Sequence, residues 1–198
     1  MPLSPPAPRE MTSHRTMVCA GYRRADGLWD IEGYLKDIRT YDFPTHDRGM
    51  LKPGEPLHEM SIRITIDEDF LIHEVEAIID FGPASLCGDV AADFKVLKGM
   101  RIGKGFNRQV RDLLGGAKGC VHLVDLMGPV ATAACQALFS EREKKAATDP
   151  NRDRPPILDQ CHALASDGPV VRRFWPQFYT GSDASEVSLT RISHRDAE

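Results

Sequence analysis

Three side chains with potential chemistry cluster in the segment from Gly119 to Asp125, which follows a glycine pair. Cys120 and His122 come first, and Asp125 lies three residues after His122, on the same face of a helix that would begin here. A helix N-terminus suits a reactive thiol or a developing oxyanion, and a carboxylate on that face can fix the imidazole tautomer. We therefore take all three as candidate catalytic residues, with simple packing as the alternative for Cys120.

His58 is the second candidate general base, because it stands at the entrance of an isoleucine-rich strand and its ordinary pKa of about 6.5 needs little tuning. His73, between acidic neighbours, is instead expected to be solvated.

A metal site is the alternative use of these side chains. Cys87, Cys120 and His122 are a possible thiolate and imidazole ligand set for Zn or Fe, although the sequence has no C-x-x-C motif. The glycine-rich segments match neither a phosphate-binding loop nor a dinucleotide fingerprint, so nucleotide binding is not expected.

Arginines near the predicted strands are candidate substrate-binding residues. Arg23 and Arg24 alternate faces, so that one can point inward and hold an anion, or pair with a carboxylate to hold strands in register. Arg63 faces away from the isoleucines of its strand, toward solvent or a cleft on the opposite face of the sheet. Trp175 belongs to a late aromatic cluster that would line a ligand pocket or anchor the C-terminal segment.

The elements that must position these residues change period near the middle of the chain. Alternating apolar and polar residues predict a strand over 17–24, a strand after the Asp26-Gly27 turn, and a hairpin over 60–80. Helical spacing then predicts helices over 86–99, 106–114 and 123–138. The fold class is therefore α+β, with an antiparallel sheet of about four to six strands followed by helices packed on one face.

The chain of 198 residues is long enough for one core. We expect a mobile leader over 1–16, a single domain over 17–180, a charged linker inside it over 141–156, and a flexible tail over 181–198. The segment 157–180 is expected to form a strand pair or a short helix.

Composition bears on location and partners. No stretch approaches the roughly 18 apolar residues of a membrane span, and the first residues do not resemble a secretion signal. The five cysteines are then expected to be reduced thiols in the cytoplasm. The net charge of −4 gives no general attraction to nucleic acid. A homodimer remains open.

Four ordered segments resemble a bacterial domain family of unknown function. They are GYRRADGLWDIEGYLKD, EPLHEMSIRITID, GGAKGCVHLVDLMGPVATAACQAL, and LDQCHAL with VVRRFWPQFY. The resemblance runs from about Gly21 to Tyr179, with departures at Val121, Asp125 and Phe106, where the family usually has Thr, Glu and Trp; a wider pocket at Phe106 is one consequence. Because members tend to lie among genes of aromatic-compound catabolism, the resemblance implies a small aromatic substrate.

The order of elements is also similar to that of NifU-type iron–sulfur scaffolds, with a cysteine after the last strand (Cys87) and a Cys/His pair opening a long helix. One cysteine of their pattern has no counterpart here.

These observations give two main hypotheses. The first is a cofactor-independent lyase that acts on a small, lignin-derived aromatic compound, for example by retro-aldol loss of formaldehyde, with His58 or His122 as the base. The alternative is a metal or iron–sulfur binding protein that uses Cys87, Cys120 and His122. An interaction module without chemistry ranks third.

Overall fold

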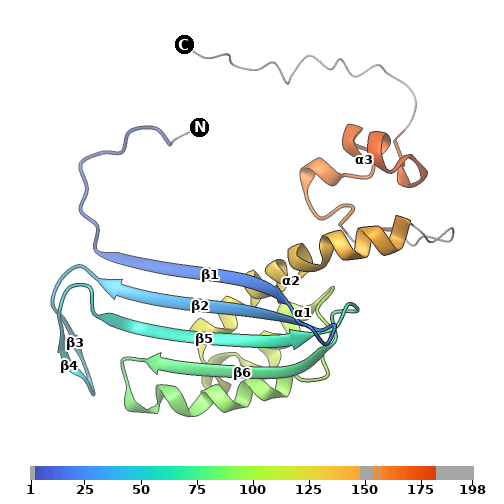
Figure 1. Cartoon of the computed structure of the whole chain (residues 1–198). Coiled ribbons are helices and arrows are strands. Elements are labelled where there is room, and N and C mark those ends of the chain that lie inside the picture. The colour runs from blue at the N-terminus through green and yellow to red at the C-terminus, as the bar shows by residue number, and fades with distance from the viewer. Residues whose placement is uncertain (1–2, 148–153, 156, 182–198) are drawn as a thin grey trace. The chain divides into compact units, whose positions relative to one another are not determined.

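Four long strands form one antiparallel sheet in the order β1-β2-β5-β6 in this computed structural model, which describes residues 3–147, 154–155 and 157–181 (Figure 1). Their bounds are Ser13–Arg23 (β1), Trp29–Arg39 (β2), Pro56–Ile66 (β5) and Ile72–Phe81 (β6). A separate two-stranded hairpin, β3 (Phe43–Thr45) and β4 (Gly49–Leu51), connects β2 to β5. Helices follow the strands, so the α+β prediction is confirmed.

Period-two alternation decides which face of the sheet is buried. In β2 the odd-numbered side chains face the core, with Ile31 and Leu35 fully buried, and their register partners Ile64 and Met60 in β5 are buried on the same face. The opposite face carries polar and charged side chains between scattered apolar ones such as Val18. The apolar face of the sheet is therefore the face that packs against the helices.

The expected turns lie where the sequence predicts them. Gly27 has a φ of +87°, the left-handed conformation that its turn between β1 and β2 requires. Between β5 and β6, the carboxylate of Asp67 accepts backbone hydrogen bonds from Asp69 and Leu71, which closes the turn.

The helices agree with the sequence in position, with two corrections. The α-helix α1 spans Phe106–Leu114 and α2 spans Val121–Ala147, as their apolar spacing predicts. The segment Ser85–Leu97 is a long 3-10 helix (η1). The predicted linker is wrong over 141–147, because α2 continues through this stretch, where Lys144 pairs with Glu141 one turn away.

Two glycines let α2 lie close to the sheet. A Cβ atom on Gly33 of β2 would stand 2.5 Å from a methyl group of Val130 and 3.1 Å from Leu126. A Cβ atom on Gly21 of β1 would stand 2.6 Å from that of Ala137. The buried side of α2 thus rests on the backbone of β1 and β2, and this close packing fixes where its first turn lies.

The chain divides into two units, Met1–Lys144 and Lys145–Glu198. In the first, β1 begins at Ser13, so residues 13–16 of the expected leader are strand. The second contains α3 (Pro169–Phe174) and two short 3-10 helices, η3 (His162–Leu164) and η4 (Pro176–Phe178), in agreement with the short-helix alternative. Residues 182–198 of the expected tail lie outside the described residues.

Contrary to the sequence expectation, one helix has the length and composition of a membrane span. Residues Val121–Lys144 of α2 reach a mean hydropathy of 1.3 over 18 residues. Leu123, Leu126, Met127 and Val130 on this helix are fully buried in the same core as the sheet, and 33% of the apolar window is buried.

Candidate functional site

Three ionisable side chains form one row across three neighbouring strands. Arg15 of β1 is the register partner of Asp37 in β2, and Asp37 is the register partner of His58 in β5. All three continue the core-facing positions of their strands, at the end of the sheet near the start of α2. A β-bulge follows Asp37 directly, an irregularity that often re-aims side chains beside functional sites.

Arg15 holds the carboxylate of Asp37 with two parallel hydrogen bonds. Its Nε donates to Oδ1 and its Nη2 donates to Oδ2, each at a distance of 2.7 Å. Burial by itself raises the pKa of Asp37, but the hydrogen bonds and charge of Arg15, together with the nearby histidines, keep that pKa below its ordinary value. Asp37 is therefore ionised at neutral pH.

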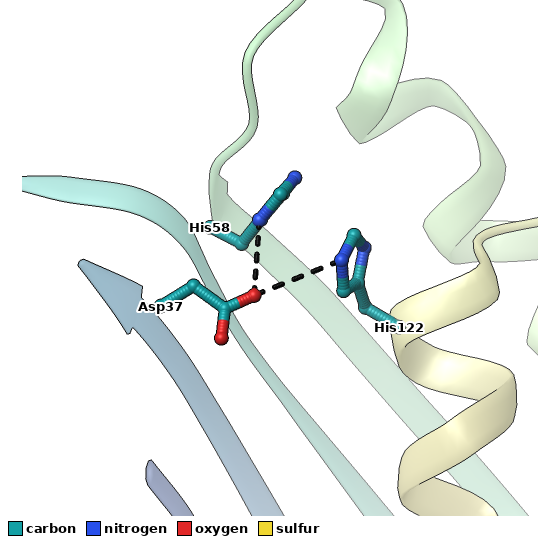
Figure 2. Close-up of side chains that lie close together, drawn as sticks. All are labelled: Asp37, His58 and His122. Atoms are coloured by element: carbon teal, nitrogen blue, oxygen red, sulfur yellow. Dashed lines mark hydrogen bonds and ion pairs between the residues drawn. The ribbon is translucent and has the colours of Figure 1, made fainter. Parts of the chain in front are cut away.

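His122 reaches the same carboxylate from the first turn of α2. Its Nε2 lies 3.7 Å from Oδ2 of Asp37, and Nδ1 of His58 lies 3.1 Å from that same oxygen. Figure 2 shows both rings turned toward this one atom, and their centroids are 3.8 Å apart. The side chains of Asp37, His58 and His122 are only 14%, 16% and 18% exposed, so the group is largely shielded from solvent.

The surroundings keep both imidazoles neutral. Burial lowers the pKa of His58, and repulsion from His122 adds to this effect. Burial also lowers the pKa of His122, followed by repulsion from the Arg15 guanidinium. Because a carboxylate only accepts hydrogen bonds, a neutral His58 carries its proton on Nδ1, toward Asp37. Its Nε2 then has a free lone pair, pointing away from Asp37 in Figure 2.

A pocket of about 340 Å³ opens beside the two rings. His58, Cys120 and His122 line it from the sheet and the start of α2, and Cys87 lines it from η1. The Sγ atom of Cys120 is 3.9 Å from Nδ1 of His122. The structure thus brings together His58, His122, Cys120 and Cys87 from three separate segments of the chain.

A metal ion would find its ligands in a different set from the one expected. Among the described residues, the ligand atoms that converge belong to Asp37, His58 and His122, all within 4.8 Å of one another. Two His and one carboxylate are a familiar donor set for divalent transition metals. Cys87 and Cys120 line the adjoining pocket but are not members of this group.

Asp125 lies near the site without hydrogen-bonding His122. Its carboxylate is 54% exposed and stands 3.9 Å from Nη1 of Arg15. Among the described residues, the carboxylate that orients the imidazoles is Asp37.

The three arginines considered for substrate binding are not brought to the pocket. Arg23 pairs with Glu141 of α2 at 3.7 Å, and Arg24 with Asp26 and Asp30 near the first turn. Arg63 pairs with Glu32 and Glu76 on the opposite face of the sheet. Each thus has a carboxylate partner, and the pairs of Arg63 link neighbouring strands as the register-holding alternative predicts.

The two aromatic candidates belong to different units of the chain. Phe106, the first residue of α1, is 2% exposed and packs in the core. Trp175 belongs to the unit Lys145–Glu198, where its ring meets that of Phe174 edge to face at a centroid distance of 6.2 Å.

Sequence reasoning missed Asp37 and Arg15, although a signal for them exists. In β2 the inward positions 29, 31, 33 and 35 predict that position 37 also faces inward, where a carboxylate is unusual. The same extrapolation places Arg15 on the inward face of β1. A charged residue at a core-facing position of a strand needs a partner, and here the two are partners of each other.

These features define an α+β protein with a shielded Asp–His–His group between the end of an antiparallel sheet and the start of a helix. The chain belongs to the family described as "Protein of unknown function (DUF2889)", which it matches over residues 13–136. The matched region contains Arg15, Asp37, His58 and His122. Comparison with curated proteins and with solved structures finds no match.

Proposed function

We propose that this protein is a cofactor-independent carbon–carbon lyase that removes formaldehyde from the hydroxymethyl group of a small, lignin-derived aromatic compound. One observation carries the proposal: a shielded His58, held by Asp37 and in contact with the ring of His122, has a free imidazole nitrogen beside an apolar pocket. A neutral imidazole with a free lone pair is a competent general base near neutral pH.

In the proposed reaction, Nε2 of His58 takes the proton of the substrate hydroxyl group. The oxygen electron pair forms the C=O bond of formaldehyde, and the C–C bond breaks toward the carbon that remains on the aromatic compound. Because that carbon receives an electron pair, the substrate must delocalise it into an electron-accepting aromatic system. The His58 imidazolium, paired with Asp37, then returns the proton to this carbon, so one base serves both transfers and the reaction balances.

His122 and Cys120 complete the proposed site. A proton on His122 would repel one on His58, so the two adjacent rings resist double protonation, which helps to keep His58 unprotonated before the reaction. Cys120 forms part of the pocket wall next to Nδ1 of His122. The first N–H groups of α2 lie at this same wall, where they favour negative charge that develops on the substrate.

The direct test incubates the purified chain with a panel of hydroxymethyl aromatic compounds in D₂O. Formaldehyde and the shortened aromatic product should appear in equal amounts, with one solvent deuterium on the carbon that lost the hydroxymethyl group. Products without formaldehyde, or formaldehyde only with an added oxidant, would overturn the proposed reaction.

The second candidate is a metal-binding protein, which the NifU-type resemblance also suggests. The observation that favours it is the spacing of the donor atoms: 3.1 and 3.7 Å from the Asp37 oxygen to the two imidazole nitrogens. Two ligands of a tetrahedral Zn²⁺ at about 2.0–2.1 Å from the metal stand roughly 3.3 Å apart. Against it, Arg15 occupies both oxygens of Asp37 and brings a positive charge to the site.

Elemental analysis of protein purified without oxygen, with its ultraviolet–visible spectrum, separates the two candidates. Activity that survives treatment with a chelator and removal of bound Zn and Fe supports the acid–base site. Near-stoichiometric Zn or Fe, lost together with activity and restored by the same metal, would favour the metal site.

We also infer the location and partners of the protein. It is cytoplasmic, takes a small aromatic substrate, and has neither nucleic acid nor a membrane as its main partner. The slightly acidic charge of the chain and the burial of the apolar side of α2 support this inference. A homodimer is also proposed, since Val18, Tyr22 and Ile78 are exposed on the face of the sheet opposite the core.

A further inference from the structure

The pocket beside the histidines has walls without formal charge, and its two ionisable imidazoles are neutral. Among the described residues, its lining side chains include no Lys, Arg, Asp or Glu. Most are apolar, with Met60 and Ile79 from the sheet and Leu86 and Val90 from η1. A ligand in this pocket therefore exchanges water for hydrocarbon over most of its surface.

The neighbouring cation is not free to bind a ligand. Arg15 gives two hydrogen bonds to Asp37 and stands 3.9 Å from the carboxylate of Asp125. A second hollow of about 380 Å³, on the opposite face of the sheet, shows the contrast, because Glu32, Arg63 and Glu76 are among its lining residues. Charged groups are thus available on that face of the sheet and lacking in the pocket beside His58.

Leu86 marks the rim of the uncharged pocket. Its side chain is 73% exposed although it lines the pocket, so bound ligand would cover apolar surface that otherwise meets water. Val90 lies one helical turn further along η1 and lines the same wall.

We propose that this pocket selects uncharged aromatic alcohols over the corresponding carboxylates, with Leu86 and Val90 as specificity-determining residues. The inference rests on the proposed function for the identity of the site and adds the charge class of the substrate. A carboxylate that enters the pocket loses its water shell and gains no cation in return. The start of α2 offers only a partial positive charge, which compensates less than a paired arginine would.

Binding of two matched probes tests this selectivity without relying on turnover. The probes are 4-hydroxybenzyl alcohol and 4-hydroxybenzoate, which share the phenol ring and differ in the charge of one substituent. Affinities are measured by calorimetry and by chemical-shift changes of His58 and His122 in the full-length chain. We expect the alcohol to bind about tenfold or more tightly than the carboxylate, a difference typical of an uncompensated buried charge.

Two arginine substitutions provide the gain-of-function arm and its control. Leu86→Arg places a cation at the pocket rim and should improve 4-hydroxybenzoate binding by about tenfold, because the carboxylate then has a partner. Val96→Arg adds the same charge on η1, at a half-exposed position that does not line the pocket, and should change neither affinity. Both positions are exposed, so both variants are expected to fold.

The possible results separate this inference from the proposed function. Selective binding of the alcohol, reduced about tenfold by Leu86→Arg, supports the inference even if no formaldehyde is released, in which case only the lyase proposal fails. Equal or tighter binding of the carboxylate by the unchanged protein would overturn the inference. So would an equal effect of both arginine substitutions, or no binding of either probe at the His58–His122 pocket.

Discussion

The imidazole rings of His58 and His122 lie with their centroids 3.8 Å apart and their planes inclined by 35°, His58 near the start of β5 and His122 on the first turn of α2. Both rings face one oxygen of Asp37, whose negative charge acts to raise the pKa of each ring. Burial outweighs this attraction, helped by repulsion from His122 at His58 and by repulsion from Arg15 at His122, so the pKa of both histidines lies below the ordinary value. The fold thus places two neutral imidazoles beside a single carboxylate.

A pH titration checks this balance. The ¹H–¹⁵N signals of His58 and His122 should titrate below the ordinary histidine pKa of about 6.5. Midpoints for His58 and His122 at or above 6.5 would contradict the account.

The same lowered pKa values predict how stability depends on pH. The unfolded chain takes up protons at these histidines near pH 6.5, whereas the folded chain resists protonation until a lower pH. The free energy of unfolding should therefore fall as the pH drops from about 6.5 toward the lowered folded pKa, and the double variant His58→Gln/His122→Gln should flatten this slope. Denaturant unfolding at several pH values measures it; an unchanged slope in the double variant would argue against lowered pKa values.

Asp37→Asn tests the orienting carboxylate. The amide is nearly the same size but uncharged, so Arg15 and His58 lose their ionic partner and the Nδ1–H tautomer of His58 is no longer enforced. We expect kcat for formaldehyde release to fall by about 100-fold or more, within the range that acid–base groups contribute. Asp125→Asn is the matched control, because this exposed carboxylate contacts only the outer side of Arg15 among the described residues, and it should lose little activity. Similar losses in both variants would show that Asp37 has no special role.

Gly33→Ala tests whether close helix packing positions the site. The added methyl group would overlap Val130 and Leu126, so α2 must move away from β2 at a cost of about 1–3 kcal/mol. Denaturant unfolding should show this loss, and the His58 and His122 signals should shift with it. Gly103→Ala meets nothing within 4 Å and should leave both measurements unchanged. A neutral Gly33→Ala variant would mean that the contact does not set the position of His122.

The sequence predicts the sheet and most helices because the residue patterns that specify each element lie within that element. Alternating isoleucines in β5 define a buried face without reference to any other strand, and the apolar spacing of α1 does the same for a helix. Local context, a strand entrance and a helix start, also singles out His58 and His122, which the structure brings side by side.

The partners within the site depend on distant residues and escape such reasoning. Asp125 is close to His122 in sequence and was therefore the expected orienting carboxylate, whereas Asp37 reaches both imidazoles only through sheet register and the packing of α2. The sequence likewise predicts substrate binding by Arg23, Arg24 and Arg63, because it does not show which carboxylates on neighbouring elements they contact.

The most direct test of the central claim compares three histidine variants in one assay of formaldehyde release. His58→Gln should lower kcat/KM by about 100-fold or more, since it removes the proposed base, and His122→Gln should lower it less. His73→Gln, which removes a histidine from another His–Asp pair of the same sheet, should retain nearly full activity. Full turnover in both His58→Gln and His122→Gln would contradict the account, because no acid–base site could then lie at this pair.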